Sequence, residues 1–343
     1  MTQAVRKLAT NCGEGTLFTD ENDYVVYNRE DHPASLLNGC SVIHGSSMTI
    51  RLAQLTDRQA LVSLWQTAPY VHLHAEWQLP VEWLGEPGFV VWAEPVRRAL
   101  AWPVETGDVL RACLALVADP LPAGWVRIAA ASITSALADT FQPLLESAWP
   151  TIIEQGITEL GWLILEPRTP SFLPHLGFAP LTELETYIKT DGSTRQPASN
   201  ERVQIRPVRV EDMAAIVRLD AAAYAPLWRY SHQTFTLARP QALTFDVALW
   251  DEQIVGSLLS MPGDDRGSAH LVRLTVSPQV QGRGVGRTLM NHFLAQCCQR
   301  GLSHISLNTQ LDNASSQRLY RQYGFRPWGA RVGVWRKEVS RDF

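Results

Sequence analysis

The sequence predicts a mixed α/β fold that is present in two tandem copies. Apolar residues 271–276 lead into a glycine-rich run, Gln281–Arg287, and then into Thr288-Leu289-Met290, which is the order strand, glycine turn, helix. A second strand and helix follow further along the chain. The same order of elements recurs at a period of about 150 residues. Helices that alternate with strands in this way indicate a sheet covered by helices.

The N-terminal region divides at Met48. Residues 1–47 are polar and aperiodic, whereas Met48-Thr49-Ile50-Arg51 begins a clean strand pattern. We therefore expect residues 1–47 to be a flexible arm, or an extension that precedes the true initiator at Met48. The first copy is expected over residues 48–189, with a helix from Asp57 to Trp65 directly after its first strand.

A polar segment with Gly, Pro and Ser, residues 190–202, separates the copies and reads as a linker. The second copy, residues 203–343, opens as the first does: Ile205-Arg206 precedes Asp212 at the spacing that separates Ile50-Arg51 from Asp57. A helix is expected from Glu211 to Tyr224. The repeat predicts one fold used twice.

The glycine-rich run of the second copy has the chemistry of a diphosphate site. Alternating glycines let the backbone approach a ligand closely, and the helix that follows presents unpaired N–H groups at its positive end. A dinucleotide fingerprint starting at Gly282 needs glycine at position 287, where Arg287 stands, and no P-loop pattern fits. The alternative is a turn that only packs a strand tightly against a helix.

A second block follows downstream. Residues 305–308 form an expected strand, and Asp312-Asn313 supplies N-cap chemistry for a helix that carries Leu319, Tyr320 and Tyr323. Gly324-Phe325 ends that helix.

The two blocks together resemble the GNAT superfamily of N-acetyltransferases. Gln281, Gly284 and Gly286 fill the acetyl-CoA signature [Q/R]-x-x-G-x-[G/A]. The family block N-x-x-A-x-x-L-Y-x-x-x-G-F is matched at five positions, with Ser316 at the usual alanine: Asn313, Leu319, Tyr320, Gly324 and Phe325. A tandem layout with one degenerate half is similar to that of mycothiol synthases. The resemblance implies an acetyl-CoA-dependent N-acetyltransferase with catalysis confined to the second copy.

The first copy lacks these features. Where the glycine-rich run belongs, residues 129–137 contain no glycine, so side chains would block a diphosphate. Pro170 and Pro174 would interrupt the helix that carries the tyrosine in the second copy. We expect the first copy to bind no acetyl-CoA.

The resemblance assigns contacts with coenzyme A to three places. The amides of residues 283–287 would hold the pyrophosphate, aided by the charges of Arg283 and Arg287, although Arg287 also reads as a solvated helix-end residue. The strand at Leu274–Val276 would pair with the pantetheine arm, and Asn313 would contact that arm or simply cap its helix. The predicted cofactor-binding set is Leu274, Thr275, Val276, Gln281, Gly282, Arg283, Gly284, Val285, Gly286, Arg287 and Asn313.

Two residues are the catalytic candidates. Tyr320 matches the family tyrosine that returns a proton to the departing thiolate, and the alternative is a core aromatic. Many members place a glutamate base six residues before the valine that is Val276 here, and that count reaches His270. A histidine can act as a base at neutral pH, but one at the start of a strand is also a common structural residue.

The acceptor amine is expected at the loop of residues 225–232 and the last strands, 328–335, by analogy with the family. The loop is faintly similar to a Pro-Trp-Ser segment of ribosomal-protein alanine N-acetyltransferases. Trp228 and Tyr230 are the predicted substrate residues, and a hydrophobic loop anchor explains the tryptophan equally well.

Composition limits the remaining classes. A net charge of −4 predicts no nucleic-acid partner. Five cysteines without a C-x-x-C pair predict neither a disulfide framework nor a metal site. No apolar run is long enough to span a membrane, so we expect a cytoplasmic monomer or homodimer that acts on a small-molecule amine or a peptide N-terminus. The alternative function is a non-catalytic module that binds or senses coenzyme A.

Overall fold

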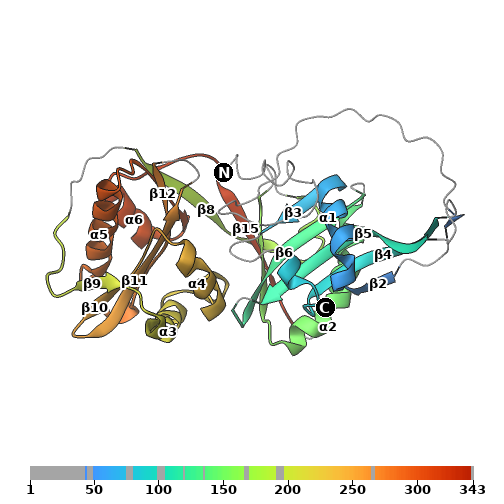
Figure 1. Cartoon of the computed structure of the whole chain (residues 1–343), viewed down its shortest axis with the longest axis horizontal. Helices are drawn as coiled ribbons and strands as arrows, with labels where there is room; N and C mark the ends of the chain where they lie inside the picture. Colours follow the sequence, from blue (N-terminus) through green and yellow to red (C-terminus); the bar gives the residue numbers. More distant parts are fainter. Residues whose placement is uncertain are drawn as a thin grey trace. The chain divides into compact units, whose positions relative to one another are not determined.

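The computed structural model describes residues 43–44, 49–74, 80–98, 105–118, 120–133, 136–165, 170–190, 197–263 and 267–340. Almost all of the expected N-terminal extension, and residues 191–196 of the expected linker, lie outside these ranges. Contacts divide the chain into two compact units (Figure 1): Met1–Ala179 with Trp335–Phe343, and Pro180–Val334.

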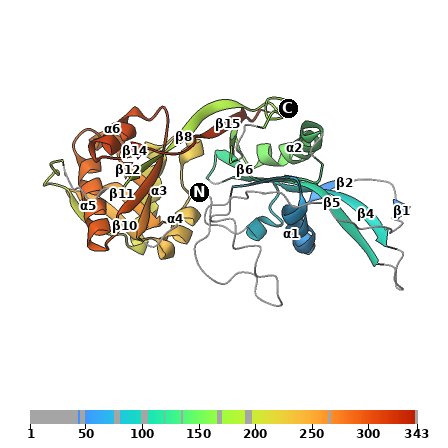
Figure 2. The ribbon, with the colours of Figure 1, turned by 90° about the horizontal axis from the view of Figure 1, so that it is seen from above.

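The first unit consists of strands on which two helices pack. Its elements are β1 (Ile43–His44), β2 (Thr49–Leu52), α1 (Arg58–Thr67), β3 (Tyr70–Leu73), β4 (Phe89–Arg98), β5 (Glu105–Ala118), β6 (Ala123–Ala131), α2 (Leu137–Glu154) and β7 (Glu159–Leu163). Figure 2 shows α1 and α2 on opposite faces of the strands. Each helix covers a core of its own, because strand side chains alternate between the two faces.

The second unit repeats this plan with more helices. Its elements are β8 (Ala179–Lys189), β9 (Gln204–Pro207), α3 (Met213–Ala223), α4 (His232–Ala238), β10 (Thr244–Trp250), β11 (Gln253–Pro262), β12 (Ser268–Val276), α5 (Val285–Gln299), β13 (His304–Gln310), α6 (Ala314–Gln322), β14 (Arg326–Pro327) and the start of β15 (Val332–Glu338). The sheet order is β8-β13-β12-β11-β10-β9, in which only β12 and β13 pair in parallel. The expected fold class is confirmed.

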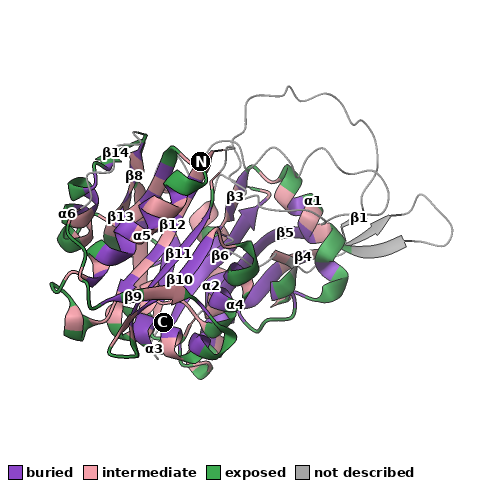
Figure 3. Cartoon of the chain, turned by 60° about the vertical axis from the view of Figure 1, so that its left-hand side comes forward, coloured by how far each residue is buried: buried purple, intermediate pink, exposed green. Residues whose placement is uncertain are grey.

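The buried side chains of the second unit gather where α5 and α6 pack on the central strands. Figure 3 shows buried residues concentrated along these strands and exposed residues on the outer helix faces. This core includes Leu289, Phe293, Leu307 and Phe325. It fixes the start of α5 beside the end of β12.

The compact units depart from the expected repeat, 48–189 and 203–343, at their last strands. Strand β8 follows the first copy but pairs with β13 of the second unit, from Lys189 opposite Ile305 to Leu184 opposite Gln310. Residues 335–343 belong to the first unit, where the Val339 N–H donates to the Thr158 carbonyl over 2.9 Å. The two copies therefore exchange their last strands.

The repeated Arg–Asp spacing forms the same structure in each unit. Arg51 pairs with Asp57 at 2.7 Å, and Arg206 pairs with Asp212 at 2.6 Å. In both units the aspartate also accepts a backbone N–H three residues upstream of it, at 2.8 Å. The Arg206 guanidinium lowers the pKa of Asp212 below its usual value. The spacing therefore marks a clamp that fixes the start of the first helix.

None of the helices in the described part of the chain is long and apolar enough to cross a membrane.

Candidate functional site

Strand β12 contains a β-bulge at Val272. Its neighbour β11 pairs Leu259 with Arg273 and Ser260 with Leu271, so Val272 is an extra residue. An extra residue reverses which face the following side chains point to.

The bulge sends the two ends of β12 into different surroundings. Before it, odd-numbered residues pack in the core under α5; after it, even-numbered residues do: Ala269, Leu271, Leu274 and Val276. Arg273 and Thr275 face α3 instead, where both side chains reach Asp220. Thr275 is thus placed toward α3, while Leu274 and Val276 lie beside α5.

Strands β12 and β13 separate beyond the bulge. Their parallel pairing runs from Ser268 opposite His304 to Leu271 opposite Leu307. Both strands continue, but the described residues include no further pair between them. The Tyr224 hydroxyl donates to the Leu274 carbonyl over 2.8 Å at this separated edge. The backbone of residues 272–276 is therefore an edge where an extended ligand can add hydrogen bonds.

The glycine turn and the start of α5 form a cradle next to this edge. Gly284 is the N-cap, with a left-handed φ of 89° and no side-chain cap for the helix. A Cβ at Gly284 would lie 3.4 Å from the Cβ of Asn200 and from Nη2 of Arg287. Since the first N–H groups of a helix lack intrahelical partners, they are available to an anion. These residues fit the diphosphate of coenzyme A.

The other predicted cradle residues surround this turn. Gln281 donates from Nε2 to the Val276 carbonyl at 3.2 Å, and Gly282 also has a positive φ of 76°. Val285 is buried in the core, and a Cβ on Gly286 would meet side chains of α6 and β12. Arg283 and Arg287 are both exposed, and Arg283 lies over the Trp250 ring at 5.9 Å.

Asn200 supports the cradle from outside and was missed by the sequence analysis. Its Nδ2 donates to the Arg283 carbonyl at 2.8 Å, and its backbone N–H donates to Oγ1 of Thr288 at 2.9 Å. Asn291 of α5 holds the same segment by donating to the Pro197 carbonyl at 2.8 Å. Polar linker composition gave no signal for this role, because the contacts are long-range.

Tyr320 is both a core residue and a neighbour of the separated edge. Its ring lies 6.3 Å from that of Tyr187 and 6.1 Å from that of Phe325. Burial, together with the nearby Tyr224 hydroxyl, raises the pKa of Tyr320. The phenol therefore stays protonated at neutral pH and is able to donate a proton.

The remaining predicted residues have defined partners. His270 lies opposite Ser306 in the parallel ladder, and its Nδ1 is 2.8 Å from Oγ of Ser306. It points to the α3 face, because Ala269 and Leu271 point to the α5 core. Asn313 caps α6 by accepting the Ser316 N–H at 3.1 Å, so the helix-cap alternative is observed. Its contact with coenzyme A stays a prediction.

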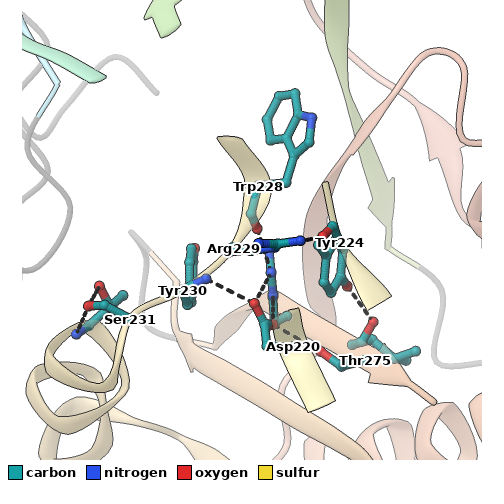
Figure 4. A network of polar contacts seen from close by, with 10 residues as sticks. Asp220, Tyr224, Trp228, Arg229, Tyr230, Ser231 and Thr275 are labelled. Carbon is teal, nitrogen blue, oxygen red and sulfur yellow. Dashed lines mark hydrogen bonds and ion pairs between the residues drawn. The ribbon is translucent and has the colours of Figure 1, made fainter. Parts of the chain in front are cut away.

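The predicted substrate residues Trp228 and Tyr230 lie in a loop, residues 224–231, which we call the acceptor loop. A buried ion pair fixes it: Arg273 donates from Nε and Nη2 to the two carboxylate oxygens of Asp220, at 2.8 and 2.7 Å. Nη2 of Arg273 also donates to the Trp228 carbonyl, and the Tyr230 N–H donates to Asp220 at 2.9 Å. Figure 4 shows this network beneath the loop.

Two aromatic rings enclose the guanidinium of Arg273. Its Cζ lies 3.5 Å from the centre of the Tyr224 ring and 4.4 Å from that of Tyr230. Burial alone would lower the pKa of Arg273, but electrostatic interaction with Tyr224 and with the Asp220 carboxylate raises it overall. Sequence reasoning missed Asp220 and Arg273. The signal was present, since Asp220 is the one acidic residue of a mostly apolar helix and Arg273 is the one Arg, Lys, Asp or Glu residue of β12.

The first unit has the same bulge but a filled edge. Strand β5 pairs Ala115 with Ile128 and Leu116 with Val126, so Arg127 is the extra residue. Strand β3 then pairs with β6 from Tyr70 opposite Ala131 to Leu73 opposite Ile128. These positions of β6 correspond to residues 273–276 of β12. Strand β3 therefore occupies the edge that is open in the second unit.

Comparison with known proteins agrees with this geometry. Residues 212–325 match the model of the acetyltransferase (GNAT) family. The chain is 22% identical over 131 residues to a putative [ribosomal protein bS18]-alanine N-acetyltransferase of Bacillus subtilis, a match that covers 38% of this chain and 85% of that protein.

Two further similarities are to another acetyltransferase and to a solved tandem structure. A mycothiol acetyltransferase of Acidothermus cellulolyticus is 42% identical over 59 residues, which is 17% of this chain and 18% of that protein. The structure of a tandem GNAT protein from the clavulanic acid biosynthesis pathway superposes with a TM-score of 0.51 at 15% identity, covering 87% of this chain and all of that one. At that identity the likeness shows the fold alone.

Proposed function

Because the chain belongs to the GNAT superfamily of acyltransferases and carries its fold in tandem, we propose that the second unit transfers acetyl from acetyl-CoA to a primary amine. The amine is a small molecule or a peptide N-terminus, attacking directly in a ternary complex. The observation that carries the proposal is the uncapped helix start at Gly284 beside the open edge of β12. The helix start suits the diphosphate of coenzyme A, and the open edge suits its pantetheine arm.

The steps of the reaction then fall to four groups of predicted residues. Amides at residues 284–287 bind the diphosphate, and the backbone at 274–276 pairs with the pantetheine arm. Acetyl-CoA supplies an activated thioester. His270 removes the proton of the ammonium group, and the free amine forms the C–N bond as the C–S bond breaks. Tyr320 protonates the departing sulfur, and the proton that the nitrogen loses restores the phenol.

Thiol release and titration calorimetry test this proposal together. A panel of amines and peptides, including one with an N-terminal alanine, is supplied with acetyl-CoA, and free thiol is measured. We expect amine-dependent release. Binding of acetyl-CoA without release from any amine would favour a non-catalytic CoA module, and no binding at all would reject both functions.

Removal of the His270 imidazole should lower the rate of thiol release at pH 7 about 100-fold. In His270→Ala no imidazole accepts the amine proton, so only the small share of the amine that is already neutral in water can react. His304→Ala is the control, since His304 is an exposed residue at the start of β13. A His270→Ala rate equal to that of the unsubstituted protein would remove His270 from the mechanism.

Acetyl-CoA should bind with a stoichiometry of one per chain. Backbone pairing with β3 fills the edge of the first unit, so a pantetheine arm has no free backbone groups there. Calorimetric titration checks this. A second saturable site with comparable enthalpy would contradict the role given to β3.

A further inference from the structure

We propose that Arg273 and Asp220 are positioning residues that set the acceptor loop, residues 224–231, as one wall of the amine site. The inference rests on the proposed function and concerns residues that the family motifs do not include. Three observations support it: the polar network that holds the loop, the absence of the pair from the equivalent positions of the first unit, and the contacts of Tyr224 with both Arg273 and Leu274.

Arg273 and Asp220 contact each other and the backbone of the acceptor loop. Arg273 contacts Asp220 through two hydrogen bonds and the Trp228 carbonyl through a third. Asp220 accepts the Tyr230 N–H, so backbone groups on both sides of residue 229 are fixed. The side chain of Arg229 closes the loop by donating from Nε to the Tyr224 carbonyl at 3.0 Å. Buried charges that are fully paired hold one geometry rigidly.

The first unit shows that this fold forms without the pair. Counting from the equivalent residues Arg51 and Arg206, position 65 corresponds to 220, and the two bulges align Ile128 with Arg273. Trp65 and Ile128 pack in an apolar core there. Replacing a buried ion pair by apolar side chains is often neutral or stabilising. Folding therefore does not require the pair, which is present in the copy with the open edge.

The same guanidinium sets the position of Tyr224. The Tyr224 ring lies against Arg273 while its hydroxyl donates to the Leu274 carbonyl, on the edge assigned to the pantetheine arm. Figure 4 shows the Trp228 indole pointing away from Asp220, on the other side of the loop backbone. The Arg273–Asp220 pair thus links the acceptor loop to the edge assigned to the pantetheine arm. Small displacements between reacting groups lower rates strongly.

Arg273→Lys tests the role of the Arg273–Asp220 pair, with Arg206→Lys as its matched control. Lysine keeps the charge but cannot form the bidentate contact, reach the Trp228 carbonyl and stack between two rings at once. The probe is the amine of highest rate in the thiol-release panel. We expect Arg273→Lys to raise its KM at least about tenfold, with the Kd of acetyl-CoA within about twofold. Hydrogen exchange in residues 224–231 becomes faster. Arg206→Lys, which alters a bidentate pair outside the loop, leaves the KM unchanged.

A double variant separates positioning from folding. Asp220→Leu with Arg273→Met makes both positions apolar, as they are in the first unit. We therefore expect a Tm at or above that of the unsubstituted protein. The KM should rise as it does in Arg273→Lys. An unchanged KM in either variant overturns the inference while leaving the acetyltransferase intact. A rise in KM that is fully explained by a lower Tm of the variant also overturns it. If the unsubstituted protein acetylates no amine of the panel, the proposed function fails and the inference fails with it.

Discussion

Replacing Gly284 by valine should weaken acetyl-CoA binding at least about 100-fold, which is about 3 kcal/mol. Gly284 has a φ of 89°, and any Cβ there lies 3.4 Å from Asn200. Valine would both strain the backbone and place methyl groups where the helix N–H groups meet the diphosphate. Titration calorimetry with acetyl-CoA measures the change.

Gly301→Val is the matched control for this prediction. Gly301 follows the other end of the same helix with a similar positive φ of 69°, and a Cβ there meets nothing within 4 Å. Both substitutions cost about 1–2 kcal/mol of stability through backbone strain. Only Gly284→Val should lose affinity. Equal losses in the two variants would mean that strain, and not the cradle, explains the effect.

Replacing Tyr320 by phenylalanine should lower kcat about 100-fold while the Kd of acetyl-CoA stays within about twofold. The phenol is kept protonated by burial and by the nearby Tyr224 hydroxyl, so it is a donor at every pH at which the protein is assayed. Phenylalanine keeps the ring contacts with Tyr187 and Phe325 and removes only the hydroxyl group, which carries the proton. Steady-state thiol release and calorimetry separate the two effects.

Tyr323→Phe controls for the loss of a buried hydroxyl at the end of the same helix. The Tyr323 hydroxyl donates to the Arg287 carbonyl at 2.9 Å and lies 2.6 Å from Oδ1 of Asn291, and burial raises its pKa to about 12. Its removal should cost about 1–2 kcal/mol of stability with turnover retained. A Tyr320→Phe protein with full turnover, or with the same profile as Tyr323→Phe, would reject Tyr320 as the proton donor.

Local signals account for most of what was predictable. The helix over Val285–Gln299, the cap at Asn313 and the repeated Arg–Asp clamps are each written within a few neighbouring residues. Glycine conformation, helix capping and hydrophobic periodicity depend on residues that are close together in the sequence, so the sequence is enough to predict them. The cradle and Tyr320 belong to this class.

The sequence by itself determined that the fold occurs twice and that one copy carries the glycine cradle. Only the tertiary structure decided that β3 fills the first edge, that the last strands are exchanged, and that Arg273 meets Asp220 under the acceptor loop. A short strand such as Tyr70–Leu73 has the same alternation whichever edge it joins, so its partner is chosen by packing. Likewise, a charge in an apolar segment shows that a partner must exist, but the fold alone brings that partner from 53 residues away.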